Sequence, residues 1–200
     1  MRYRLFAAIV LIVLLASSCH RERLAAPPPG LHRRADRAIT YFLDEGASDA
    51  VELAVRESFQ LWSDATIFKF TYGGKAPGRI ARDGRNMVVM MKRWPKELPI
   101  DSVAWSQLYL DASGDIVESD ILLNDEAFTF TTRREAKADS IYIEDVLAKA
   151  IGKALGIGLG TGDADDSVRG YRVAAAGLGF EPGIDPAEMA AYLSLYEAKP

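Results

Sequence analysis

The sequence predicts an α/β domain, because segments with the composition of β-strands alternate with segments that have the apolar periodicity of helices. Ala38–Asp44 is rich in β-branched and aromatic residues, as strands are. Apolar residues recur at helical spacing from Val51 to Trp62, and a second such stripe runs from Ile143 to Leu155. The chain has 200 residues, of which 49% are hydrophobic, and this suits one globular domain.

Five segments have the composition of strands. Gly73 and Gly74 are expected to close the second of them, because glycines punctuate strands. The third is a short apolar run bounded by charge, and a turn over residues 112–115 separates the fourth from the fifth. The expected strands are 38–44, 66–72, 86–91, 102–110 and 115–124.

Three helices are expected, and capping residues set their limits. Ser48 is suited to be the N-cap of the first helix. Gly156 follows the second helix, expected over residues 139–155, and glycine commonly ends helices. Asp185 is suited to cap the last helix, with Pro186 at its first position.

The first 19 residues resemble a bacterial lipoprotein signal. Arg2 and Arg4 precede the apolar run Leu5–Ala16, which is shorter than the roughly 20 residues that span a bilayer. Two serines then lead to Cys19, the single cysteine of the chain. The resemblance implies cleavage before Cys19, acylation of its thiol and anchoring at the cell envelope, in the outer membrane if the cell has one. The alternative is an ordinary signal peptide with a chance cysteine.

Residues 19–37 are expected to form a tether ahead of a domain at 38–200. The sequence AAPPPG at Ala25–Gly30 favours an extended polyproline conformation. Removal of residues 1–18 leaves 22 basic and 28 acidic residues, and this net of −6 argues against nucleic-acid binding. Five arginines flank the proline run and are expected in solvent, with anionic lipid headgroups as the alternative contact: they are residues 21, 23, 33, 34 and 37.

Several segments together resemble the matrixin branch of the metzincin peptidases, in particular its short bacterial members. FQLW at Phe59–Trp62 is similar to the end of the family's first helix, and Met87–Pro95 to its third strand and the segment after it. Ser102–Asp125 is similar to the fourth and fifth strands, and Ile184–Tyr196 to the closing helix. The resemblance implies a twisted, mostly parallel five-stranded sheet with one antiparallel edge strand. It also implies long helices on one side of the sheet and a final helix below the substrate cleft.

The segment KAIGKALGIGL, Lys149–Leu159, aligns with the zinc motif HExxHxxGxxH of that family but keeps only its glycine. In active relatives the histidines bind zinc and the glutamate activates the zinc-bound water. The positions of the three histidines, the glutamate and the methionine of the Met-turn hold Lys149, Lys153, Leu159, Ala150 and Arg169, respectively.

The composition also argues against a catalytic zinc. Zinc sites use His, Cys or carboxylate ligands, and the two histidines, His20 and His32, both precede residue 38. A protonated lysine has no lone pair for a metal and repels the cation. We therefore expect no metal, no cofactor and no zinc-dependent proteolysis.

Lys149 and Lys153 should share one helical face, which in the resembled family floors the substrate cleft. One hypothesis is a cationic floor that pairs with an acidic group of a partner. In a second hypothesis, an aspartate of the same chain neutralises the charge of these two lysines. In a third, both lysines are solvated on an exposed helical face. The candidate aspartates are Asp163, Asp165 and Asp166.

Residues 102–111 correspond to the family's edge strand, which binds extended peptide by backbone pairing. Such pairing needs no metal and can persist after the metal is lost. Trp105, Leu108 and Tyr109 are the candidate side-chain contacts for a peptide. The alternative is a capped edge whose aromatic side chains face the core.

Other chemistries fit the sequence poorly. GIGLGTG at 156–162 follows a helix, whereas phosphate loops precede one and use its N–H groups. DADD at 163–166 lacks the spacing of an EF-hand loop. No histidine after residue 32 is present to activate a serine nucleophile.

The sequence thus predicts a lipid-anchored, proteolytically inactive, matrixin-like protein that binds a peptide or protein in its former substrate cleft. Two alternatives remain. One is an active peptidase of the same fold with non-standard chemistry, and the other is an inert structural lipoprotein of the envelope.

Overall fold

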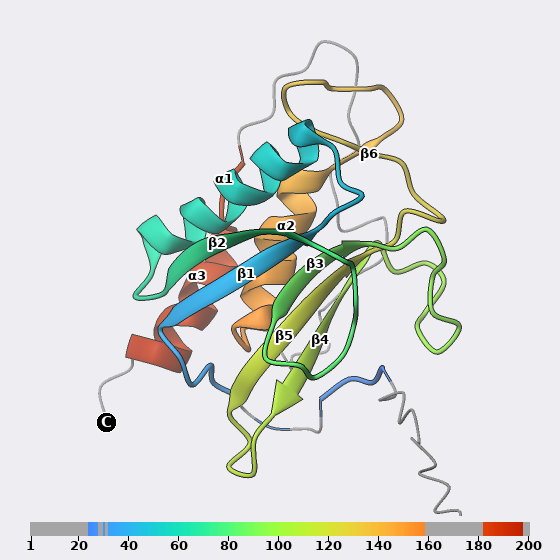
Figure 1. The fold of residues 1–200 in the computed structure, drawn as a ribbon. Helices are drawn as coiled ribbons and strands as arrows, with labels where there is room; N and C mark the ends of the chain where they lie inside the picture. Colours follow the sequence, from blue (N-terminus) through green and yellow to red (C-terminus); the bar gives the residue numbers. More distant parts are fainter. Residues whose placement is uncertain (1–23, 28–29, 31, 159–181, 198–200) are drawn as a thin grey trace, which may run out of the picture.

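The computed structural model describes residues 24–27, 30, 32–158 and 182–197. Its main feature is a five-stranded sheet in the order β2-β1-β3-β5-β4, beside a separate pair, β6-β7 (Figure 1). The strands are β1 (Ala38–Asp44), β2 (Lys69–Ala76), β3 (Asn86–Met90), β4 (Ala104–Leu110), β5 (Ile116–Leu123), β6 (Phe130–Thr131) and β7 (Ile141–Tyr142). The helices are α1 (Asp49–Ala65), α2 (Ile143–Ala154) and α3 (Pro186–Tyr192), which continues as a π-helical turn, Leu193–Glu197.

The sheet is parallel except at one edge. β1 pairs in parallel with β2 and β3, β3 pairs in parallel with β5, and β4 runs antiparallel to β5. This confirms the predicted α/β class, the five-stranded, mostly parallel sheet with one antiparallel pair, and the three helices. β4 ends the strand order, so it has a paired neighbour on one side only within the described sheet.

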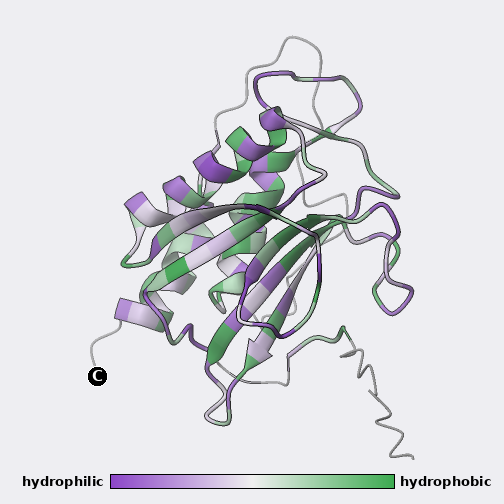
Figure 2. Ribbon diagram, in the orientation of Figure 1, coloured by the Kyte–Doolittle hydropathy of each residue, from purple (hydrophilic) through white to green (hydrophobic). Residues whose placement is uncertain are grey.

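Helices α1 and α2 cover one face of the sheet, and the main core lies between them and the strands. Trp62 of α1 is fully buried there, and its Nε1 donates a 3.0 Å hydrogen bond to the carbonyl of Ala148 in α2. Figure 2 shows hydrophobic residues along the strands, while α1 alternates between hydrophobic and hydrophilic residues, as an amphipathic helix does. None of the helices in the described ranges is long and apolar enough to cross a membrane.

The predicted helix starts are confirmed at α1 and α3. The Ser48 hydroxyl accepts a 3.3 Å hydrogen bond from the Val51 N–H, so it caps α1. Asp185 accepts from the Ala187 N–H at 2.7 Å, and Glu188 accepts in return from the Asp185 N–H. Asp185 and Glu188 thus form a capping box, which fixes the Glu188 side chain at the start of α3.

The expected second strand was wrong in its limits. β2 begins at Lys69 and continues through Gly73 and Gly74 to Ala76. Gly73 lies inside the strand. A Cβ at this position would approach the Phe42 ring to 2.4 Å, so only glycine fits here without a shift of the ring. The glycine therefore makes room for a neighbouring ring and does not end the strand.

The second helix starts later than predicted. Residues 139–142 do not join α2, because Ile141 and Tyr142 pair with β6 as the short strand β7. The other end agrees with the prediction. Gly156 has φ of +86°. The Gly156 and Ile157 N–H groups bond to the carbonyls of Lys153 and Gly152, as in a Schellman motif.

Residues 32–35, which the sequence assigned to the tether, pack against the domain. The Ile116 N–H donates to the Arg33 carbonyl at 2.7 Å, and the Ala35 N–H donates to the Ile116 carbonyl at 3.0 Å. Arg34 is only 3% exposed, so the expectation that this arginine is solvated was wrong. Gly156 allows the close approach, because a Cβ there would lie 2.0 Å from the carbonyl oxygen of His32.

Candidate functional site

The candidate site is centred on the two lysines of α2. Lys149 and Lys153 lie one turn apart and are both partly exposed. Lys153 is in the last turn of the helix, where a cation is favoured by the helix dipole. Both lysines make further interactions, so neither is an isolated charge on an open surface.

Glu188 of α3 lies over this part of α2. Its Oε1 is 3.7 Å from the position that a Cβ on Gly152 would take, and Gly152 separates the two lysines along the helix. Burial raises the pKa of Glu188, while the charges of Lys149 and Lys153 act in the opposite direction. The structure therefore brings an internal carboxylate close to both lysines. The sequence hypothesis of an internal counter-charge considered only aspartates. The capping-box sequence DPAE at residues 185–188, which fixes the Glu188 side chain, was the signal that could have pointed to this carboxylate.

The remaining positions of the replaced zinc motif are only partly described. Ala150, at the position of the general base, has its side chain buried in the main core. Its carbonyl accepts a 2.9 Å hydrogen bond from the Ser106 hydroxyl of β4, so α2 is attached to the edge strand at this point. The other named positions lie outside the described residues; they are Leu159, Asp163, Asp165, Asp166 and Arg169.

The three candidate contact residues on β4 are not equivalent. Leu108 is 6% exposed and Tyr109 is 5% exposed, so both side chains are buried. The Tyr109 hydroxyl donates to Asp120 Oδ2 at 3.2 Å. Trp105 is partly exposed, and Leu24 packs against the same small hydrophobic cluster. Of the three side chains, Trp105 is therefore the one whose surface a ligand reaches without rearrangement of the strand.

Two acidic residues of β5 form a site that the sequence did not predict. Asp120 is fully buried and accepts hydrogen bonds from the N–H groups of Met87 and Ala81 as well as from Tyr109. Burial raises the pKa of Asp120 to about 7. Glu118 accepts from the N–H groups of Asp83 and Gly84 at 2.9 and 2.6 Å. These carboxylates fasten the β2–β3 loop to the sheet face opposite the helices.

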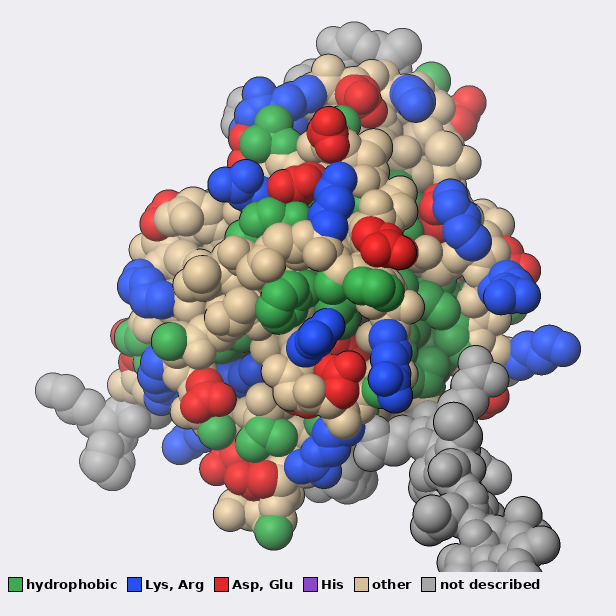
Figure 3. Space-filling view, viewed as in Figure 1, with side chains coloured by type: hydrophobic (Ala, Val, Ile, Leu, Met, Phe, Trp, Pro, Cys, Tyr) green, Lys and Arg blue, Asp and Glu red, His purple; other side chains and the backbone are tan. Residues whose placement is uncertain are grey.

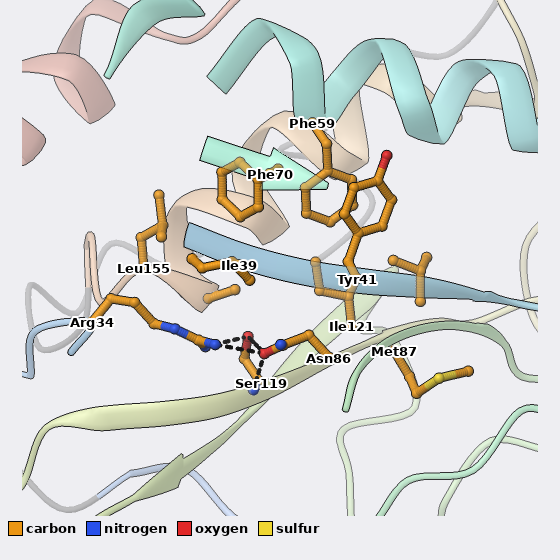
Figure 4. A pocket seen from close by; sticks show the side chains of 12 residues that line it. Arg34, Ile39, Tyr41, Phe59, Phe70, Asn86, Met87, Ser119, Ile121 and Leu155 are labelled. Carbon is orange, nitrogen blue, oxygen red and sulfur yellow. Dashed lines mark hydrogen bonds between the residues drawn. The ribbon is translucent and has the colours of Figure 1, made fainter. Parts of the chain in front are cut away.

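Arg34 lines a small void between the sheet and the helices (Figure 4). Its guanidinium donates to Ser119 Oγ at 3.1 Å and to Asn86 Oδ1 at 2.7 Å. The void has a volume of about 10 Å³, enough for about one water molecule. Burial lowers the pKa of Arg34. The residue is a packed structural cation that joins the N-terminal segment to β3 and β5.

A larger cavity of about 160 Å³ lies beside α1, and its described lining includes Glu57, Arg133 and Glu144. Glu57 pairs with Arg133 and Arg134, and Glu144 Oε1 accepts from the Arg133 N–H. Neither this cavity nor the smaller void is lined by the two lysines of α2.

Metal-ligating side chains do not converge within the described ranges. There, no three residues among His, Cys, Asp and Glu are grouped so that they could hold a metal ion. The described residues of α2 and β4 offer charge pairing by lysine and hydrogen bonding by the backbone of an edge strand.

No family model matches the chain, and no curated protein matches it either.

Proposed function

We propose that the protein is a lipid-anchored, proteolytically inactive, matrixin-like protein that binds an extended peptide or a protein segment beside α2 and β4. The observation that carries this proposal is the attachment of α2 to a sheet-edge strand through Ser106 and Ala150. It sets the helix that bears Lys149 and Lys153 alongside a strand that, in the described sheet, has a paired neighbour on one side only.

The strand order supports a zincin-type fold for this chain. A mostly parallel five-stranded sheet with an antiparallel edge strand is the arrangement that the matrixin resemblance implies. In such an arrangement a peptide adds to the edge strand through main-chain hydrogen bonds, and side-chain contacts give the specificity. The two lysines of α2 would supply these contacts on the helix side of the sheet, whereas Trp105 packs with Leu122 on the opposite side.

The replaced zinc positions support the absence of proteolysis in this proposal. The side chain at the general-base position is the buried methyl group of Ala150, which can neither accept a proton nor activate water. Lysines at the first two ligand positions repel a divalent cation. One tightly bound zinc per chain in the purified protein, measured by elemental analysis, would contradict this part of the proposal.

Glu188 sharpens the expected ligand chemistry. Because an internal carboxylate already lies near the lysines, an acidic ligand group would have to compete with it. We expect Glu188→Gln to tighten the binding of an acidic ligand and Lys149→Glu/Lys153→Glu to abolish it.

The experiment that tests the proposal is crosslinking capture in the native envelope, with the full chain and the Lys149→Glu/Lys153→Glu variant. A matched control, Lys96→Glu/Lys137→Glu, places the same charge change at exposed lysines elsewhere. A partner that is lost in the first variant and kept in the control supports a binding site beside α2. A partner that is indifferent to both changes contradicts it.

One observation favours the inert structural lipoprotein as the second candidate. Leu108 and Tyr109 are buried, and Glu188 lies close to both lysines, so part of this region already serves contacts within the protein itself. This candidate predicts no partner that depends on the lysines. Peptide hydrolysis that Lys149→Ala removes would instead favour an enzyme.

A further inference from the structure

The face of the sheet opposite the helices carries a loop rich in arginine. Residues 77–85 connect β2 to β3 and cross in front of β3 and β5 (Figure 1). Hydrogen bonds from the loop's own N–H groups to Glu118 and Asp120 fasten its backbone to β5. Since the backbone faces the sheet, the side chains of Arg79, Arg82 and Arg85 are exposed.

The charge of this loop is unbalanced at the surface. It has three arginines and one acidic residue, Asp83, while the carboxylates of Glu118 and Asp120 are buried beneath it. Figure 3 shows Lys and Arg side chains over the middle of this face, with an acidic side chain between them and an exposed hydrophobic area beside them. An anionic surface would therefore meet several arginines at once on this side of the domain.

The N-terminal segment reaches the domain on the same face. Leu24 and Ile80 of the loop pack against one cluster formed by buried residues of the sheet and the β3–β4 connection. The Ala25 N–H donates to Gln107 Oε1 at 3.1 Å, which fixes the segment beside β4. The buried members of this cluster are Trp94, Leu98 and Leu122.

Leu24 is five residues after Cys19, the proposed lipid attachment site. A fully extended chain of five residues spans at most about 18 Å. A lipid on Cys19 would therefore hold this face of the domain within about 18 Å of the membrane surface. Two of the four intervening residues, Arg21 and Arg23, are also basic.

We infer that the sheet face carrying Arg79, Arg82 and Arg85 docks on the anionic headgroups of the membrane to which Cys19 is anchored. The helices and the site beside α2 then lie on the side away from the lipid. This inference rests on the lipid anchor of the proposed function, but it does not depend on any ligand of the lysine site. Attraction between arginines and lipid phosphates weakens as salt screens it.

The test measures orientation on vesicles of phosphatidylethanolamine and phosphatidylglycerol that contain a headgroup nitroxide quencher. The full chain from its native envelope carries one added cysteine, either Pro77→Cys on the loop or Gln60→Cys on α1, labelled with a fluorophore. Both positions are exposed. The dye at position 77 should be quenched several-fold more strongly than the dye at position 60, and added salt should reduce the difference.

Two variants show whether the arginines cause this orientation. Arg79→Gln/Arg82→Gln should remove most of the difference in quenching between the two dyes, because the loss of two lipid contacts shifts the orientation equilibrium roughly 30-fold. The control Arg56→Gln/Lys137→Gln removes two exposed charges elsewhere and should leave the quenching unchanged. Equal quenching at the two dye positions, or no effect of the first variant, would overturn the inference.

The same labelling separates this inference from the lipid anchor itself. Protein without an added cysteine should take up no dye, because acylation blocks the Cys19 thiol. If Cys19 takes up the dye, the anchor is absent and both the anchor and the docking face are wrong. If Cys19 stays unlabelled and the quenching shows no preferred face, only the docking face is wrong.

Discussion

The two faces of the central sheet are held by different kinds of interaction. On the helix side, apolar side chains of α1 and α2 fill the core against the strands, and Trp62 is fully buried. On the opposite side, Asp120 and Glu118 accept hydrogen bonds from the backbone of a loop. The first face depends on volume and shape, which pH does not alter, whereas the second combines small apolar clusters with ionisable groups.

The largest effect is expected from Trp62→Ala on the helix side. The change opens a cavity and removes the hydrogen bond to Ala148, so the free energy of unfolding should fall by about 3–5 kcal/mol. Urea denaturation measures the loss as a lower midpoint. The control is Trp105→Ala on the edge strand, which should cost about 1 kcal/mol because Trp105 is only partly buried. Equal losses would contradict the stated difference in packing.

A pH-dependent stability is expected from Asp120. Its pKa is raised by burial to about 7 in the folded state, from 3.8. The folded state therefore binds more protons between these values, and stability should decrease as pH rises from 4 to 7, by about 1 kcal/mol per pH unit at most. Asp120→Asn should flatten this slope, while Asp83→Asn, at an exposed position, should keep it. Denaturation curves at several pH values report the slope, and an unchanged slope in Asp120→Asn would exclude this residue as its source.

Glu118→Gln should have a smaller effect on the same face. The carboxylate accepts one N–H group on each oxygen, whereas an amide has one oxygen and leaves the other N–H without an acceptor. The cost should be about 1–2 kcal/mol. Amide hydrogen exchange at Asp83 and Gly84 should become faster in Glu118→Gln and remain unchanged in Glu135→Gln, an exposed control. Unchanged exchange would mean that other contacts hold the loop.

The smallest effect is expected from Gly152→Ala, where α1, α2 and α3 meet. Alanine favours a helix over glycine by up to about 1 kcal/mol. The new Cβ would, however, lie 3.2 Å from the Trp62 ring, which its hydrogen bond to Ala148 holds in place. We expect a net loss of about 0.5–1 kcal/mol by urea denaturation, because overpacking outweighs the propensity. A net gain would show that the indole can shift.

The sequence predicts the helix-side face well, because apolar periodicity records which residues meet the core. The same logic fails where a residue is placed by a distant neighbour. Gly73 is typical of a turn, yet it lies within β2. The residue is a glycine there because the Phe42 ring occupies the space that a side chain would need. Ile141 and Tyr142 fit a helix start, but they pair with β6.

The candidate site was predicted in part. The spacing of Lys149 and Lys153 placed them one turn apart, and the antiparallel edge strand lies next to their helix. Glu188 was not predicted, because its proximity depends on the packing of α3 against α2. Arg34 was not distinguished from the other arginines before β1, since nothing in its local sequence indicates that Asn86 and Ser119 surround it.

The close contact between His32 and Gly156 has a mechanical consequence. A pull on the N-terminal segment would load the bond between Ala25 and Gln107 and then residues 33–35, which are bonded to Ile116 at the start of β5 and run parallel to it. The Arg34 N–H also bonds to the Tyr196 hydroxyl at 2.6 Å. Force on the N-terminus would thus be shared between β5 and the C-terminal π-helical turn before it reached β1. These hydrogen bonds would therefore have to break before a force at this end could separate β1 from the sheet.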